Sequence, residues 1–232
     1  MSQPLEFPPL LTGIAVPGDP LAAALASVAD DIEPGAVFYA VDEATMRAAV
    51  VLAPEQPLGH ALAVSFAVTL GANDAIGVLA PPEVAVHLEW PDRIRVNGAL
   101  CGRLTAHAST TDAGAEPDWL VIGLEIPVLP RTAEDPGLTP DDTSLHGEGC
   151  GDITVPDLTE AWARHMMTWL HIYLTAGFAP LHEDWRSKAY RMGEDVTTPA
   201  PGTFLGLDEW GGMILKAPET TTILPLTRLL DQ

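Results

Sequence analysis

The chain has 232 residues, of which 47% are hydrophobic, so it can form one large domain, or a domain with a small appendage, around a substantial core. It carries 32 acidic against 11 basic residues, and its net charge of −21 repels nucleic-acid backbones and anionic membranes, so neither partner is expected. The longest apolar run, residues 61–70, is shorter than the roughly 20 residues of a membrane span, and no basic region precedes an apolar one at the start of the chain, so we expect a cytoplasmic protein.

Local signals predict four elements in the first third of the chain. Residues 19–30 begin with an Asp-Pro pair, which is typical of a helix start. Residues 36–40 and 48–52 are short apolar runs between turn-forming residues, and we expect them to be buried strands. A second helix over residues 57–71 opens with proline and ends with glycine, and its apolar character nearly all round predicts a central position.

The middle of the chain has the patterns of a β-sheet. Residues 83–90 alternate between apolar and polar side chains, which indicates a strand with one buried face. The pair Asn97-Gly98 tolerates positive φ at both positions, so it predicts a tight hairpin between strands at residues 93–98 and 100–106. Residues 119–126 form another apolar strand pattern.

The last third of the chain contains a loop, a helix and a group of short strands. Residues 127–151 are rich in Pro, Asp, Gly and Thr and predict a long surface loop. Thr154 and Asp157 fit the start of a helix that ends at Gly177. After Trp185, three short β-like segments follow, at residues 203–207, 213–215 and 221–224.

These elements predict an α+β fold with two domains. Residues 1–186 form a mixed β-sheet backed by helices, and residues 187–232 form a small β domain that resembles a barrel. The seven histidines show no metal-ligand spacing, so no metal site is predicted. The two cysteines are too few for a disulfide framework, and residues 1–187 contain no lysine, so arginine must supply the fixed positive charges there.

Residues 88–104 resemble the signature of the biotin/lipoate protein ligases, in which a Trp-Pro-Asn-Asp strand end leads through a hairpin to a strand with a lysine. Residues 119–126 and the helix with Trp162 and Trp169 are similar to the next elements of that family, and residues 206–215 are similar to the SH3-like domain of biotin ligases. The resemblance implies a mixed sheet backed by helices and followed by an SH3-like barrel. It also implies a reaction in which ATP activates biotin or lipoate as an acyl-adenylate before transfer to a carrier domain.

The chain departs from that signature at three points. Counted from Asp92, the signature lysine falls at Ala99. The Asn of the signature is missing, because Trp90 and Pro91 are followed directly by Asp92, and the family lysine before the tryptophan is Glu89. No glycine lies between Gly35 and Gly59, so the Gly-Arg-rich loop that covers the adenylate is absent. Because loss of one fixed charge costs several kcal/mol of transition-state stabilisation, ATP-dependent ligation is not expected.

The resemblance therefore predicts a ligase-like protein that binds a biotin-, lipoyl- or fatty-acyl-type ligand or its carrier domain. We assign no cofactor, and biotin, lipoate or octanoate is the expected type of ligand. The ligand-binding residues that it implies are Trp90, Asp92, Asn97, Gly98, Ala99, Gly102, Arg103 and His107.

Two other functions stay open from the sequence. Some acyltransferases of this superfamily carry the acyl group on a cysteine, and Cys150 or Cys101 would be that nucleophile, with His146 or His107 as a base. The alternative is that neither cysteine has a chemical role, with Cys101 a small buried strand residue and Cys150 an ordinary loop residue. The remaining hypothesis is a non-catalytic interaction or regulatory protein.

Overall fold

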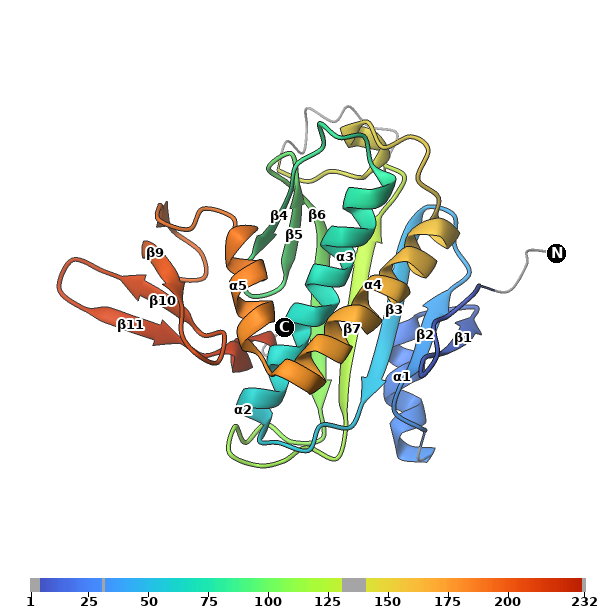
Figure 1. The fold of residues 1–232 in the computed structure, drawn as a ribbon, viewed down its shortest axis with the longest axis horizontal. Helices are drawn as coiled ribbons and strands as arrows, with labels where there is room; N and C mark the ends of the chain where they lie inside the picture. Colours follow the sequence, from blue (N-terminus) through green and yellow to red (C-terminus); the bar gives the residue numbers. More distant parts are fainter. Residues whose placement is uncertain (1–4, 31, 131–140, 231–232) are drawn as a thin grey trace.

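The computed structural model describes residues 5–30, 32–130 and 141–230, and its centre is a seven-stranded mixed sheet (Figure 1). The strand order is β1-β2-β3-β7-β6-β5-β4, with β1 parallel to β2 and the other neighbouring pairs antiparallel. The strands are β1 (Thr12–Val16), β2 (Ala36–Ala40), β3 (Thr45–Leu52), β4 (Val86–Glu89), β5 (Arg93–Val96), β6 (Ala99–Ala108) and β7 (Leu120–Pro127).

Helices cover both faces of the sheet. The long helices α3 (Ser65–Leu79) and α4 (Val155–Ala176) lie against each other on one face, over the main core (Figure 1). Helix α1 (Pro20–Ser27) lies on the opposite face, over β2, β3 and β7. The shorter segments are α2 (Leu58–Ala61), α5 (Ala179–Ser187) and the 3-10 helices η1 (Val28–Asp30), η2 (Leu62–Val64), η4 (His146–Glu148) and η5 (Leu226–Leu230). The predicted mixed sheet backed by helices is confirmed.

The predicted central helix is buried, but it does not end at Gly71. The helical stretch Leu58–Leu79 is long and apolar enough to cross a membrane, yet 78% of its apolar window is buried inside the fold, as expected for a core helix. At Gly71 a Cβ atom would lie 2.7 Å from the backbone nitrogen of Met166 in α4. The glycine therefore permits two helices to approach closely, and it does not stop the helix that contains it.

The predicted hairpin at Asn97-Gly98 is confirmed. The two residues have φ angles of 50° and 92°, and Val96 pairs with Ala99 across the turn. The Asn97 side chain fixes the turn from both sides, because Oδ1 accepts from the backbone N–H of Ala85 at 3.0 Å and Nδ2 donates to Glu148 at 2.9 Å.

Several elements were not predicted from the sequence, among them strand β1 and helix α5. Strand β1 is a short, largely exposed edge strand that pairs only with β2, and helix α5 is short and buries only Leu181 and Trp185. Such weak apolar patterns give little local signal. The predicted loop over residues 127–151 includes residues 131–140, which lie outside the described residues; its described end holds η4.

The chain ends in a four-stranded antiparallel sheet of order β11-β10-β9-β8, beyond strand β4 (Figure 1). Its strands are β8 (Asp195–Val196), β9 (Gly202–Leu207), β10 (Met213–Lys216) and β11 (Thr221–Leu224). This sheet fits the predicted small barrel-like domain. The proposed domain boundary after residue 186 stays a prediction. The chain just beyond it is joined to the central sheet, because the backbone of residues 188–190 hydrogen-bonds to Leu88 of β4.

Candidate functional site

A row of charged side chains crosses the sheet on the face opposite to α3 and α4. Glu89 of β4 lies opposite Arg93 of β5, which lies opposite Arg103 of β6. Arg103 in turn lies opposite Glu125 of β7, and Glu125 lies opposite Arg47 of β3. The alternate residues of these strands are buried in the main core, so the row lies on the other face of the sheet, which on β3 and β7 also carries apolar residues packed under α1.

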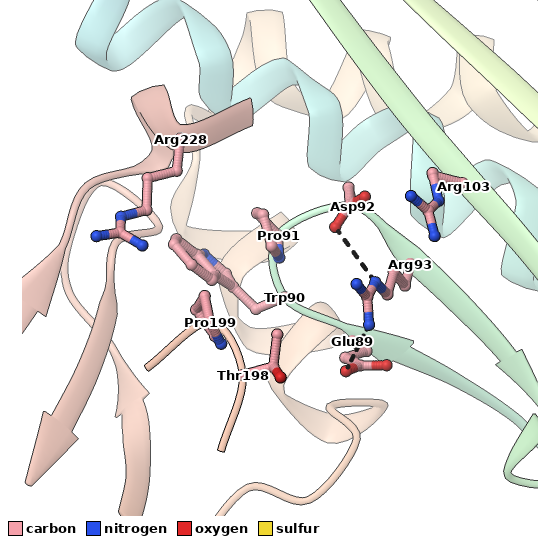
Figure 2. Close-up of a pocket in the computed structure, with 9 residues that line it drawn as sticks. All are labelled: Glu89, Trp90, Pro91, Asp92, Arg93, Arg103, Thr198, Pro199 and Arg228. Carbon is pink, nitrogen blue, oxygen red and sulfur yellow. Dashed lines mark ion pairs between the residues drawn. The ribbon is translucent and has the colours of Figure 1, made fainter. Parts of the chain in front are cut away.

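One end of this row opens into a cavity of about 450 Å³ (Figure 2). The central sheet contributes the turn between β4 and β5 and two arginines to its lining: Glu89, Trp90, Pro91, Asp92, Arg93 and Arg103. The C-terminal part of the chain contributes Thr198, Pro199 and Arg228. We call this hollow the arginine cavity, and it exists only where the two parts of the chain meet.

The arginine cavity combines an apolar wall with an excess of positive charge. Trp90, Pro91 and Pro199 form the apolar wall. The rest of the lining is Thr198 and five charged side chains, which leave one formal positive charge: Arg93, Arg103 and Arg228 against Glu89 and Asp92. In a chain with a net charge of −21, such an excess favours an anionic ligand at this place.

A second hollow of about 940 Å³ lies beside the first, between the hairpin and residues 189–194. Tyr190 stacks over the Arg95 guanidinium at 4.6 Å, and Arg191 donates to Glu194 at 3.0 Å. Hydrogen bonding to Glu194 raises the pKa of Arg191 further above its ordinary value. With Arg95, the two hollows gather five of the chain's eleven basic residues: Arg93, Arg95, Arg103, Arg191 and Arg228.

The architecture and the sequence place this molecule in a known family. Residues 7–187 match the sequence model of the Biotin/lipoate A/B protein ligase family. The chain belongs to this family. The resemblance seen at residues 88–104 is thereby confirmed, and residues 192–232 match a separate Domain of unknown function (DUF4444).

Individual relatives share the architecture at different levels of identity. A biotin protein ligase-like protein of unknown function from Silicibacter sp. is 44% identical, with a TM-score of 0.92 over 99% of this chain and 100% of that one. A biotin–[acetyl-CoA-carboxylase] ligase from Paracoccus denitrificans is 28% identical over 179 residues, which are 73% of this chain and 74% of the relative. The biotin protein ligase of Aquifex aeolicus is 16% identical with a TM-score of 0.74 over 92% of this chain and 95% of that one, which shows the shared fold alone.

The ligand-binding residues that the resemblance implied do not lie together in this structure. Trp90, Asp92 and Arg103 line the arginine cavity, whereas Asn97 and Gly98 line the second hollow. Ala99, Gly102 and His107 line neither. Their roles stay predictions. The remaining residues of the cavity were not among the predicted ligand-binding residues; they are Glu89, Pro91, Arg93, Thr198, Pro199 and Arg228.

The lining residues from the C-terminal part carry no signal of their own in the sequence. Thr198, Pro199 and Arg228 belong to no motif, and tertiary packing brings Arg228 to the cavity, since η5 lies against β6, α2 and η2. Glu89 did have a signal, because it stands where the family signature has a lysine, and Arg93 lies in the same stretch, residues 88–104.

Both candidate nucleophiles lie in the main core. Cys101 is 2% exposed and Cys150 is 1% exposed, and neither is in a disulfide. Burial, with a smaller contribution from Glu148, raises the pKa of the Cys150 thiol, which disfavours the reactive thiolate. The proposed base His146 is engaged elsewhere, since its Nε2 lies 2.9 Å from the carbonyl oxygen of Ile153.

We predict that neither thiol reacts quickly with DTNB in the native protein, and that both react in denaturant. The reason is that a buried, protonated thiol needs local opening before it can attack a disulfide. The measurement is the absorbance of released thionitrobenzoate with time. A fast phase in the native protein that disappears in Cys150→Ser would contradict the prediction and support the acyltransferase hypothesis. The same variant would then show whether a thioester adduct forms on Cys150.

The turn between β2 and β3 has only four residues, 41–44, at the place where the resemblance implied a Gly-Arg-rich loop. Asp42 closes this turn, because its Oδ1 accepts from the N–H of Ala44 at 2.8 Å and its Oδ2 pairs with Arg47 at 3.0 Å. The hydrogen bond from Ala44 is the main reason that the pKa of Asp42 is lowered, so the turn stays acidic. A short acidic turn offers no cradle for phosphate groups.

Proposed function

We propose that this chain binds the carboxylate of a biotin-, lipoyl- or fatty-acyl-type ligand in the arginine cavity and does not convert it into an acyl-adenylate. The observation that supports this most is the composition of the cavity: an apolar wall at Trp90 and Pro199 faces three arginines that outnumber the carboxylates by one. One excess positive charge suits a ligand with one negative charge and an apolar body.

The size of the cavity agrees with a small acyl ligand. Its volume of about 450 Å³ lies within the roughly 300–1,000 Å³ of small-molecule sites in proteins. Arginine also suits the task, because its planar guanidinium can hold both oxygens of a carboxylate with two parallel hydrogen bonds.

The same region argues against bound ATP. The triphosphate brings several negative charges, whereas the lining of the arginine cavity supplies one net positive charge.

Isothermal titration calorimetry with biotin, lipoate, octanoate and ATP tests the proposal. We expect at least one of the three carboxylates to bind without ATP, and no release of pyrophosphate when ligand and ATP are mixed. The absence of binding by all three carboxylates, or ATP-dependent pyrophosphate release, would contradict it.

We predict that Arg103→Gln weakens carboxylate binding about tenfold or more, since a charge-assisted hydrogen bond contributes about 1.5–3 kcal/mol. Arg164→Gln is the matched control, because Arg164 lies on α4, on the other side of the sheet, with 55% of its side chain exposed. Titration of both variants with the bound carboxylate is the measurement, and equal affinities would place the ligand outside the arginine cavity.

The macromolecular partner that fits this ligand is a biotinyl or lipoyl carrier domain, and we propose a cytoplasmic setting for the encounter. Pull-down of purified biotinyl and lipoyl carrier domains by the intact chain tests this part separately. Failure to retain either domain would restrict the proposed function to the free small molecule.

A further inference from the structure

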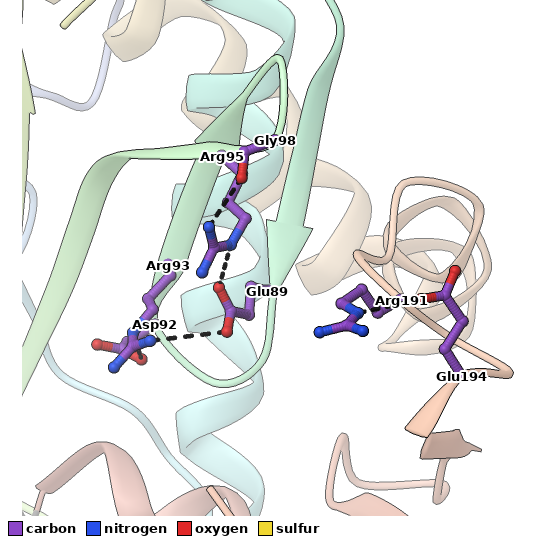
Figure 3. A network of polar contacts seen from close by, with 7 residues as sticks. All are labelled: Glu89, Asp92, Arg93, Arg95, Gly98, Arg191 and Glu194. Atoms are coloured by element: carbon purple, nitrogen blue, oxygen red, sulfur yellow. Dashed lines mark hydrogen bonds and ion pairs between the residues drawn. The ribbon is translucent and has the colours of Figure 1, made fainter. Parts of the chain in front are cut away.

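Glu89, the last residue of β4, lines the arginine cavity. Its side chain is 18% exposed and reaches two guanidinium groups at once. One carboxylate oxygen lies 3.6 Å from Nη1 of Arg93, and the other accepts a hydrogen bond from Nε of Arg95 (Figure 3). Arg95 is itself only 15% exposed, so this pair is shielded from water.

The position of Glu89 sets the charge of the cavity. With Glu89 ionised, the lining has one excess positive charge, and without that charge it would have two. Half-buried charges are screened less than surface charges, so a ligand in the cavity responds to this difference.

The charge of the ligand then decides how well it is accepted. Attraction to the cavity rises in proportion to the ligand's charge, whereas the cost of removing an ion from water rises with the square of its charge. One excess positive charge therefore suits a monoanion, and two excess positive charges offset the larger desolvation cost of a dianion.

We infer that Glu89 is a specificity-determining residue, which restricts the arginine cavity to ligands with a singly charged carboxylate and excludes those that end in a doubly charged phosphate. This inference rests on the proposed function of the cavity. It adds which residue selects the head group, and it names the class of ligand that is rejected.

Octanoate and octyl phosphate form a matched pair of probes, since they share the eight-carbon chain and differ in the head group. At pH 8 octanoate carries one negative charge and the phosphate monoester close to two, because its second pKa is about 6. Calorimetric titration of both probes into the wild-type protein and into Glu89→Gln measures the selectivity directly.

We expect the wild type to bind octanoate more tightly than octyl phosphate. Glu89→Gln should bind octanoate about fivefold more tightly, which corresponds to about 1 kcal/mol for one charge. Removal of one negative charge from the cavity changes the binding free energy of a dianion by twice as much as that of a monoanion. The affinity for octyl phosphate should therefore rise about 25-fold. Glu89→Asp keeps the charge and should retain the preference for octanoate.

Glu33→Gln controls for the loss of one negative charge elsewhere, as Glu33 is exposed before β2, at the opposite end of the strand order from β4. If Glu89→Gln and Glu33→Gln leave the ratio of the two affinities equally unchanged, the inference is wrong. If neither the wild type nor Glu89→Gln binds octanoate, the proposed function fails first.

A comparison that needs no variant covers the case in which Glu89→Gln does not fold. Octyl methyl phosphate has the phosphorus head group with a single charge, so the wild type should bind it more tightly than octyl phosphate. Tighter binding of octyl phosphate than of both monoanions by the wild type would overturn the role of Glu89.

Discussion

Replacing Gly71 by alanine is expected to lower the free energy of unfolding by about 2–3 kcal/mol, the usual cost of forcing an extra group into a close-packed interior. The added Cβ would lie 2.7 Å from the backbone nitrogen and 2.8 Å from the Cα of Met166, so α3 and α4 would have to separate. For a chain of this size the change should appear as a fall in Tm of about 5–10 °C. Urea and thermal unfolding followed by circular dichroism measure it.

Gly77→Ala is the control on the same helix. Nothing lies within 4 Å of a Cβ at Gly77, and the residue is exposed. Alanine there should raise stability by up to about 1 kcal/mol, because it restricts the unfolded chain and favours the helix. A similar loss in both variants would show that the close approach of α4 is not the reason for Gly71.

Gly71 also shows what local sequence patterns could and could not predict about this fold. The apolar residues of α3 correctly predicted a central helix, and Asn97-Gly98 correctly predicted the hairpin, since both depend on neighbouring residues. The end of α3 was predicted wrongly, because a glycine in a local sequence pattern suggests a helix end. Here the glycine is needed because Met166, which is far away in the sequence, approaches too closely for a Cβ atom. Edge strand β1 was missed for a similar reason, as pairing with β2 and not its own pattern makes it a strand.

The residues of the candidate site also fall into those that local sequence predicted and those that only tertiary packing brings together. Trp90, Asp92 and Arg103 follow from a contiguous stretch of sequence that could be compared with a family signature. Arg228 and Pro199 enter the cavity only through tertiary packing of the last part of the chain against the β4–β5 turn. Sequence reasoning also placed weight on Cys101 and Cys150, and their burial in the core depends on contacts that no local pattern reveals.

Replacing Trp90 by alanine is expected to lower the free energy of unfolding by about 3–5 kcal/mol, the usual range for a buried aromatic residue. Trp90 is 3% exposed, forms the apolar wall of the arginine cavity, and donates from Nε1 to the carbonyl oxygen of Gly211 at 2.8 Å. The same side chain thus belongs to the core, to the cavity and to the contact with the C-terminal sheet. Urea unfolding followed by circular dichroism gives the stability, and unchanged stability would show that this contact does not hold the C-terminal part in place.

Trp90→Phe separates the hydrogen bond from the apolar wall. Phenylalanine keeps most of the ring but leaves the buried carbonyl of Gly211 without its donor, which costs about 1–3 kcal/mol. We expect this variant to bind octanoate nearly as well as the wild type, so octanoate at 100 times its Kd should stabilise both by about 2.7 kcal/mol. Trp90→Ala should show little of that stabilisation, because the wall itself is gone. Equal stabilisation of Trp90→Ala and the wild type by octanoate would mean that the ligand does not contact Trp90, and would move the acyl site away from the arginine cavity.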